Sequence, residues 1–442
     1  MSGNPSTTPS SLSGYDTSTE QPPEPSTREK TGIETENVRQ LQHHEIDYPE
    51  GGLRAWLCIA GSSAIMFSTF GYLNSWGIYQ DYYHSHQLRD YSQSTISWIG
   101  SVQVFLQFAG GIVGGPLFDR YGTIPFLPAT VGYFLSIVFT SLSSKYYQFF
   151  LSQSILGGLC IGVMFTPSIA IVRHYFHRRM GAAMGIVVAG SSIGGLVFPI
   201  LLNRLLYHHK IAFGWAVRAC ALIVLVLLSF AILVIRPRLK PSKHPFDFKL
   251  LKRPVYILAV VGIWLMNWGL YVPFFYLPSF ALKVGMDPQL ASYMVAILNG
   301  VSFFGRIFAG LAADKVGRFN MLTGMSLGSG TLLFCWPAIH TNTGIIIFSA
   351  FVGFFVGAIV SLLSACVAQI TPDPKYVGAL TGFSMMFWSF AGLSGPPISG
   401  AIIGSNGDFY KAGLFGGAAF FAGAIIVFAG RLVAQPKLAA RF

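Results

Sequence analysis

The chain has 442 residues, of which 52% are hydrophobic and 10% are charged, and its formal net charge is +12. Soluble domains carry roughly 25% charged residues, so this composition excludes an ordinary soluble protein and predicts an all-α polytopic membrane protein. Most of the basic residues lie in short loops between apolar runs, where they set the orientation of the helices. We therefore expect no nucleic-acid partner.

The first 47 residues differ in composition from the rest of the chain. Residues 1–47 are rich in Ser, Thr, Pro and Glu and contain no hydrophobic run. Such a segment cannot bury a core, and it lacks the apolar region of a cleavable signal peptide. We predict a disordered cytosolic tail at 1–47, followed by a first transmembrane helix that acts as the targeting signal.

Apolar segments of about 20 residues, the length that spans a bilayer, recur from residue 55 onward. The predicted transmembrane helices are twelve, at 55–78, 94–117, 125–143, 148–172, 181–203, 214–235, 254–282, 289–313, 320–340, 344–370, 376–404 and 409–431. A basic stretch with three prolines at 236–253 separates them into six-helix bundles at 48–235 and 254–432, and 433–442 is a C-terminal tail. The excess of basic loop residues on one side places both termini in the cytosol.

Two segments at helix entries are rich in glycine and arginine. Residues 50–56 read EGGLRAW before the first helix, and residues 175–185 read YFHRRMGAAMG at the start of the fifth. Glycine permits a sharp entry of the chain into a helix, and paired arginines suit the basic membrane face. The positions that define these segments are Glu50, Gly51, Gly52, Trp56, Tyr175, Phe176, Arg178, Arg179 and Gly185.

An octapeptide recurs in the two sets of helices. The sequence GPLFDRYG at 115–122 returns 195 residues later as GLAADKVG at 310–317. Glycine permits close helix approach, and an aspartate can accept hydrogen bonds from a helix N-terminus, so the motif either controls conformation or forms a structural turn. The repeated positions are Gly115, Asp119, Arg120 and Gly122, and Gly310, Asp314, Lys315 and Gly317.

A second repeat has nearly the same offset. Residues 181–185 and 378–382 share the pattern Gly-Ala-x-x-Gly, 197 residues apart. Two offsets that agree within two residues indicate duplicated halves, with a substrate site at their interface near the membrane midplane.

The doubled motif resembles the cytoplasmic loop motif of the major facilitator superfamily, whose members are secondary transporters that work by alternating access. Segments 50–56 and 175–185 resemble the two signatures of its monocarboxylate porter family. The wording of PEGGLRAWL and NSWGIYQDYY is similar to the fungal branch of that family, including transporters from secondary-metabolite clusters. The resemblance covers residues 48–432 and implies two pseudo-symmetric six-helix bundles.

Arg306 is the only charge set well inside an apolar run. Burying an arginine in a bilayer costs on the order of 3 kcal/mol, so either it binds an anion or its side chain reaches along the helix toward Asp314. Asn299, Ser302 and Arg306 share one helix face, which we expect to face the cavity. The resemblance implies that Arg306 is the partner of the substrate anion.

Other polar or aromatic side chains in the spans are candidates for the cavity wall. For each of them, an interhelical hydrogen bond, worth about 0.6 kcal/mol, explains the residue about as well as substrate contact does. They are Tyr72, Asn74, Gln103, Gln107, Asn267, Tyr271 and Trp388. By alignment with the animal carriers of the family, Asn74 and Ser302 stand where those carriers have a Lys and an Asp, so coupling to protons is in doubt.

We therefore expect a secondary transporter of a small or medium organic acid that exports a secondary metabolite. Uptake of a monocarboxylate, with or without protons, is the alternative, and a metabolite sensor built like a transporter is an alternative of another class. No P-loop and no Cys or His cluster at ligand spacing occurs in the sequence, so we expect no enzyme activity, cofactor or metal. The protein should act as a monomer in the plasma membrane, with the vacuolar membrane as the alternative.

Overall fold

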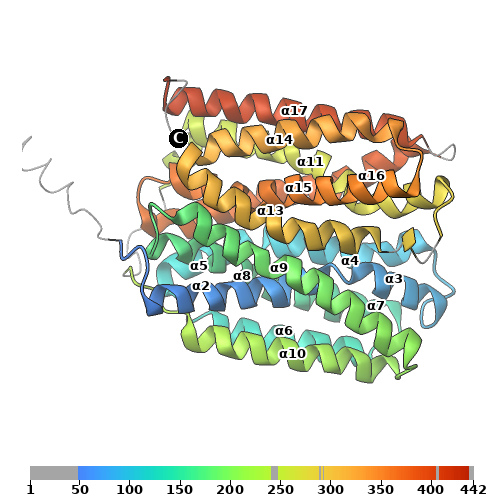
Figure 1. Ribbon diagram of the computed structural model, residues 1–442. Helices are drawn as coiled ribbons and strands as arrows, with labels where there is room; N and C mark the ends of the chain where they lie inside the picture. The colour runs from blue at the N-terminus through green and yellow to red at the C-terminus, as the bar shows by residue number, and fades with distance from the viewer. Residues whose placement is uncertain (1–47, 240–246, 288–289, 292, 405–407, 438–442) are drawn as a thin grey trace, which may run out of the picture. The chain divides into compact units, whose positions relative to one another are not determined.

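The computed structural model describes residues 48–239, 247–287, 290–291, 293–404 and 408–437, and these residues contain helices and turns but no strand (Figure 1). The predicted tail at 1–47, part of the predicted linker and the last five residues lie outside this part of the chain. We call the described residues up to 239 the first half and those from 247 the second half.

The helices of the first half are α2 (Leu53–Met66), η1 (Phe67–Gly71), α3 (Trp76–Ser85), α4 (Gln93–Ala109), α5 (Gly111–Tyr121), α6 (Phe126–Leu142), α7 (Tyr146–Phe149), η2 (Phe150–Gly157), α8 (Gly158–Ala170), η3 (Ile171–His174), α9 (Met180–Asn203), η4 (Arg204–His208) and α10 (Phe213–Val234). Those of the second half are η5 (Phe248–Lys252), α11 (Pro254–Lys283), α13 (Met294–Val316), α14 (Arg318–Cys335), η6 (Trp336–Ala338), α15 (Asn342–Ile370), η7 (Pro374–Tyr376), α16 (Val377–Ile403) and α17 (Phe409–Ala434).

Each predicted span overlaps a helical segment. Ten segments of the described chain are long and apolar enough to cross a membrane. The two other spans correspond to α6, which has 17 residues, and α14, which has 18 and carries polar side chains such as Asn320 and Ser326. The molecule is therefore a multi-pass membrane protein, as the sequence predicts.

The first span is interrupted, which the sequence does not predict. Between α2 and α3 the chain passes through a π-helical turn, η1, and then a turn at Asn74–Ser75. Gly71 at the end of η1 lies against Gly194 of α9, where an added Cβ would be 2.7 Å from the Gly194 Cα. The close contact needs two glycines, and the π-turn changes which side chains of this span face inward.

The two halves meet along three long helix pairs. α13 packs against α9, and α16 packs against both α5 and α4. In Figure 1 the orange α13 lies directly beside the green α9. Each of these pairs joins one helix of the first half to one of the second, so a site at the interface is built by both.

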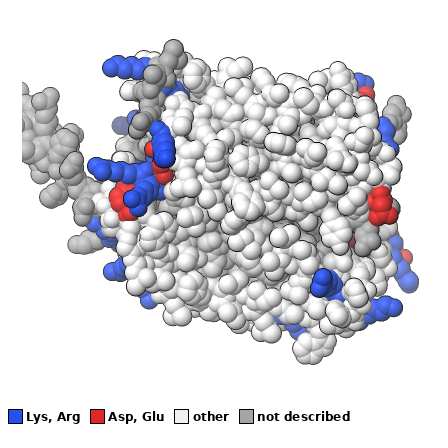
Figure 2. Space-filling view, in the orientation of Figure 1, with Lys and Arg blue, Asp and Glu red and all other residues white. Residues whose placement is uncertain are grey.

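The surface is banded in the way a bilayer requires. Figure 2 shows Lys, Arg, Asp and Glu gathered toward the two ends of the helices, with an uncharged surface between them. Large apolar side chains such as Val226 of α10 and Phe304 of α13 are more than half exposed there. Apolar side chains on this surface are stable against lipid and would be costly in water.

Candidate functional site

A cavity of about 60 Å³ lies at the interface between the two halves, enclosed by helices of both. Its lining is mostly aromatic and aliphatic, with a few polar groups, as is typical of small-molecule sites. It is formed by Met66, Phe70, Phe108, Phe165, Ile169, Val188 and Ser191 of the first half, and by Asn267, Leu270, Tyr271, Val360, Leu363, Ser364, Met385 and Trp388 of the second.

Three of the predicted lining residues, all in the second half, do line this cavity. Asn267 and Tyr271 are on α11, one turn apart, and Trp388 is on α16. The Asn267 amide nitrogen donates to the Ile263 carbonyl at 2.8 Å, and the Trp388 indole nitrogen donates to the Val260 carbonyl at 3.1 Å. Both side chains are thus held in fixed orientations beside the cavity.

Arg306 is fully buried and does not extend toward Asp314. Its Nη1 atom donates to the Val188 carbonyl at 2.7 Å and to the Ser191 hydroxyl at 2.5 Å, both on α9. Among the described residues no carboxylate pairs with it, and its Nε has no hydrogen-bond partner. Because Val188 and Ser191 line the cavity, Arg306 is one residue removed from it.

The polar stripe on α13 faces α9 of the other half. The Ser302 hydroxyl lies 2.7 Å from the Ser192 hydroxyl and also donates to the Asn299 carbonyl. Neither amide atom of Asn299 has a partner among the described residues. Asn299, Ser302 and Arg306 are absent from the cavity lining, so the expectation that this face borders the cavity is not met; the stripe lies in the α9–α13 interface.

The predicted lining residues of the first half lie elsewhere. The hydroxyl of Tyr72 is hydrogen-bonded to that of Tyr79, and the Asn74 amide donates to the Phe70 carbonyl at 3.1 Å. Gln103 and Gln107 are buried in α4, and both amide atoms of Gln107 lack partners in the described chain. Their neighbours Phe70 and Phe108 line the cavity instead, and no sequence signal distinguishes these phenylalanines from other apolar residues.

The repeated aspartates join the two halves at one end of the helices. The Asp119 carboxylate at the end of α5 accepts the Gly378 and Ala379 N–H groups of α16 at 3.2 and 2.6 Å. The Asp314 carboxylate in α13 accepts the Gly181 and Ala182 N–H groups of α9 at 2.7 and 2.8 Å. Each aspartate thus caps the N-terminus of a helix from the other half, where a negative charge is stabilising. We call these the two inter-half caps.

The repeated glycines make the two inter-half caps possible. A Cβ at Gly115 would lie 2.0 Å from the Gly378 carbonyl oxygen, and one at Gly310 would lie 2.4 Å from the Gly181 oxygen. Gly122 and Gly317 end the two motif helices with φ of 66° and 103°, which an L-residue rarely adopts. Arg120 and Lys315 are exposed beside them.

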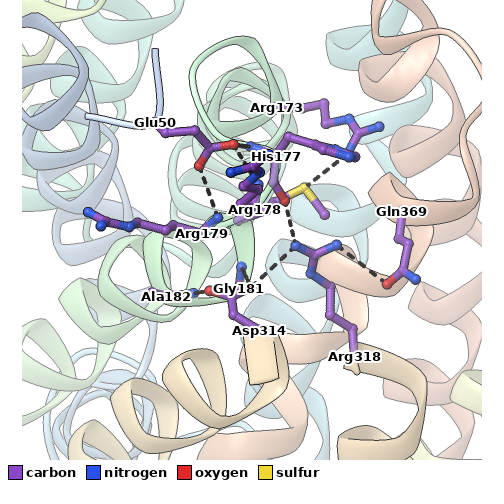
Figure 3. A network of polar contacts seen from close by, with 11 residues as sticks. Glu50, Arg173, His177, Arg178, Arg179, Gly181, Ala182, Asp314, Arg318 and Gln369 are labelled. Atoms are coloured by element: carbon purple, nitrogen blue, oxygen red, sulfur yellow. Dashed lines mark hydrogen bonds and ion pairs between the residues drawn. The ribbon is translucent and has the colours of Figure 1, made fainter. Parts of the chain in front are cut away.

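The two signature segments, far apart in the sequence, are joined by Glu50 (Figure 3). Its carboxylate accepts the N–H groups of His177, Arg178 and Arg179 at 2.7, 2.6 and 3.0 Å. Partial burial raises the pKa of this carboxyl, but the three backbone donors outweigh burial, and the pKa lies below its ordinary value. The sequence placed both segments at helix entries and did not reveal that they bind one another.

The surrounding signature residues shape this junction. Gly51 and Gly52 have φ of 157° and 87°, which turn the chain into α2. The Trp56 ring lies 5.3 Å from that of Phe176, and the Tyr175 hydroxyl donates to the Arg236 carbonyl at 2.6 Å. Farther along α9, Gly185 lies against α13, where an added Cβ would be 2.6 Å from the Arg306 carbonyl oxygen.

Arg318 connects the Glu50 junction to one inter-half cap. Its Nη2 donates to the His177 carbonyl at 2.8 Å and to Asp314 at 3.2 Å, and its Nη1 lies 3.5 Å from the Gln369 amide oxygen (Figure 3). The sequence offered one signal for this role, since Arg318 follows Asp314 by four residues.

Residues 56–341 match the family model described as Major Facilitator Superfamily. The chain is 43% identical over 388 residues to the aspyridones efflux protein of Emericella nidulans, covering 87% of this chain and 79% of that protein. It is 40% identical to the agnestins efflux protein of Paecilomyces divaricatus (86% and 88% covered) and 33% identical to the fujikurins efflux protein of Gibberella fujikuroi (98% and 93%).

Solved structures share the fold at low sequence identity. The fucose:proton symporter of E. coli superimposes with a TM-score of 0.68 at 14% identity, covering 84% of this chain and 98% of that one. The human organic anion transporter MFSD10 gives a TM-score of 0.63 at 15% identity, covering 87% and 100%. From the family model and the fungal relatives, the chain belongs to the Major Facilitator Superfamily, and it is a membrane transporter of a small-molecule substrate.

Proposed function

We propose that this transporter exports an organic-acid secondary metabolite by alternating access. The observation that carries the proposal is the pair of inter-half caps, which close one end of the interface while a cavity lined by both halves remains in the middle. Access from that end requires both caps to break, so the halves must move relative to one another. The efflux names of the three fungal relatives support export as the direction.

The lining of the cavity supports a partly aromatic substrate. Phe70, Phe108, Phe165 and Trp388 offer ring faces, and Asn267 offers hydrogen bonding. A volume of about 60 Å³ is too small for such a molecule, so the side chains or the halves must separate when it binds.

An anionic group on the substrate would meet Arg306 beside Ser191. Rotation of the guanidinium from the α9 acceptors toward the cavity would exchange two neutral acceptors for a carboxylate or enolate, which binds a guanidinium more strongly. We keep the proposal that Arg306 is the anion partner, with Asn299 and Ser302 as neighbours that position it. The resemblance to the monocarboxylate porter family is the second support.

Proton coupling has little support from the cavity. No Asp or Glu is among its lining residues in the described chain. A proton would then have to travel on the substrate itself, as a neutral weak acid. We propose transport without a proton-binding side chain.

The basic residues at one end of the helices support a proposal for the orientation of the protein in the membrane. The motif-bearing end holds the exposed cations Arg178, Arg179 and Lys315, and the rule that positive loops stay inside supports a cytosolic position for this end. We propose that both termini are cytosolic and that the protein acts in the plasma membrane, where export to the medium would require it. We propose that it acts as a monomer and catalyses no chemical reaction.

Metabolite profiling tests the function directly. Cells that lack the protein should retain in the cytoplasm an organic acid that wild-type cells release to the medium, and re-expression should restore its release. The Arg306→Lys variant, which should keep the wild-type stability and lose transport, serves as the transport-deficient control. Equal distributions of every acid inside and outside both strains would contradict export, and pH-dependent influx of labelled monocarboxylate would point to uptake.

A further inference from the structure

A second cavity, of about 490 Å³, lies at the motif-bearing end and is separate from the central one. It is formed where η3 of the first half meets η5 and the ends of α11, α15 and α17 of the second. Its lining residues are Arg173, Leu250, Arg253, Val255, Tyr256, Gln369, Ile370, Thr371, Pro372, Leu380, Val433 and Ala434.

Arg173 is a buried cation in this lining. It is 6% exposed, and its Nη1 contacts the His177 ring nitrogen Nδ1 at 2.9 Å and the Met180 sulfur at 3.7 Å. Its guanidinium carbon lies 5.7 Å from the centre of the Tyr48 ring. The Nε atom has no hydrogen-bond partner among the described residues. Burial of a guanidinium with an unpaired N–H donor lowers the stability of the fold unless an anion binds to it.

Arg253 supplies a second cation to the lining of the same cavity. It is exposed, stands immediately before α11, and donates from Nη1 to the Ile370 carbonyl at 3.2 Å. That single contact leaves most of its five N–H donors available. No Asp or Glu lines the cavity in the described chain, and the nearby Asp373 carboxylate accepts the Lys375 N–H at 2.9 Å. The two positive charges therefore lack a counter-charge within the lining.

The cavity combines this basic part with an apolar one. Val255, Leu380 and Val433 contribute to its lining, and Val433 is 56% exposed on α17, one of the helices long and apolar enough to cross the membrane. A basic pocket at the membrane edge with an apolar wall fits a phosphate group that carries an acyl chain. A dianionic phosphate also matches two guanidinium groups better than a single carboxylate does.

We propose that this cavity is a binding site for a phosphomonoester anion, held between Arg173 and Arg253, and that it takes the headgroup of an anionic phospholipid. Binding there is linked to the contacts between the halves. Arg173 contacts His177, and the His177 carbonyl holds Arg318, which contacts Asp314 of one inter-half cap (Figure 3). An anion that draws Arg173 away from His177 would shift His177 and, through its carbonyl, the contact between Arg318 and Asp314.

The test measures lipid binding by the purified full-length protein in detergent, using native mass spectrometry with phosphatidic acid and with phosphatidylcholine. We expect phosphatidic acid to bind in preference, and Arg253→Gln to weaken its binding about tenfold, since one charge-assisted contact is lost and tenfold corresponds to about 1.4 kcal/mol. The double variant Arg173→Gln/Arg253→Gln should abolish the preference. The matched control is Arg178→Gln/Lys252→Gln, which removes two exposed charges at the same end that do not line the cavity.

Arg253→Gln alone carries the test if the double variant fails to fold, because Arg253 is exposed. Competition with glycerol 3-phosphate separates the two sources of the phosphate group. Displacement only by lipid supports the headgroup, whereas displacement by both supports a soluble phosphate ester at the same site. Unchanged phosphatidic acid binding in Arg253→Gln, or an equal loss in the control double variant, would overturn the proposal.

Discussion

Single residues decide whether the two halves can touch and whether they can hold an anion. Arg306 joins the two halves through one atom, Nη1, which donates to both acceptors on α9. Its Nε remains without a partner among the described residues. The contact to α9 therefore uses only part of the guanidinium fork, and an anion would use the rest.

Substitution of Arg306 separates these two roles. A lysine at 306 keeps the charge and can still donate to Val188 and Ser191, but it lacks the planar fork. We expect Arg306→Lys to retain thermal stability close to wild type and to lose transport by about tenfold or more. Arg306→Ala should still insert into the membrane, but it should lose transport and unfold at a lower temperature. Export by the lysine variant at the wild-type rate would show that Arg306 serves only the α9 contact. Transport assays and thermal unfolding give the two readings.

Gly310 tests how close the halves must lie. A Cβ at this position would be 2.4 Å from the Gly181 oxygen, which is backbone and cannot rotate away. We expect Gly310→Ala to separate α9 from α13 at a cost of about 1–3 kcal/mol and to speed hydrogen exchange in 180–185. Gly324→Ala on α14 is the control, since nothing lies within 4 Å of its Cβ. Equal exchange in the two variants would contradict the proposed close contact.

At the scale of helices, the two inter-half caps are exchanged contacts. The aspartate of the first half caps α16 of the second, and the aspartate of the second half caps α9 of the first. The sequence repeat predicted the residues and left open whether they form turns or control conformation. A sequence offset links a position in the first half to the equivalent position in the second half. It does not show which helices of the two halves pack against each other.

Removing the charge of one capping aspartate should destabilise only the helix N-terminus that this aspartate caps. We expect Asp119→Asn to raise hydrogen exchange at 377–382 and Asp314→Asn to raise it at 180–185, each by about tenfold, because a hydrogen bond to a charged acceptor contributes about 1.5–3 kcal/mol. Asp408→Asn, which removes the charge from a local cap of α17, should change neither segment. Protection that stays the same in both cap variants would show that packing alone holds the halves together.

The Glu50 junction should depend on pH in one direction. Its folded-state pKa lies below the ordinary 4.5, so its contribution to stability is present above that value and is lost as the pH falls through the lowered pKa. We expect Glu50→Gln to lower stability by about 1 kcal/mol at about pH 7 and to match wild type once the pH is below the lowered pKa of Glu50, as read by thermal unfolding. A difference that persists unchanged in acid would contradict a role for the carboxylate charge.

For the whole molecule, the fold could be predicted from the sequence and the cavity only in part. Apolar length and loop charge define the spans, even for the more polar α14. The cavity depends on how each helix is rotated, and the π-turn η1 brings Phe70 to the lining while Tyr72 contacts Tyr79. A period of 3.6 residues cannot anticipate that change. Asn267, Tyr271 and Trp388, which are candidates from the sequence, border the cavity from the continuous helices α11 and α16, and their contact with substrate stays a prediction.

The N-terminal segment distinguishes a transporter from a sensor. Deletion of residues 2–47 leaves Tyr48 and Glu50 in place. Because the deleted segment contains no hydrophobic run, we expect the truncated protein to export its substrate at a rate within about twofold of wild type. Measured release of the metabolite to the medium gives the result. Loss of a cellular response with transport unchanged would instead assign a signalling role to the tail.

The two inter-half caps together affect the rate of the transport cycle. If each cap contributes about 1.5–3 kcal/mol, the two together slow opening of the closed end by about a hundredfold to ten-thousandfold, at tenfold for every 1.36 kcal/mol. Such a barrier would make the exposure of the cavity slower than the binding of substrate within it. The rate of a full cycle would then be set at Asp119 and Asp314, far along the chain from the residues that choose the substrate, and related carriers could change cargo without changing speed.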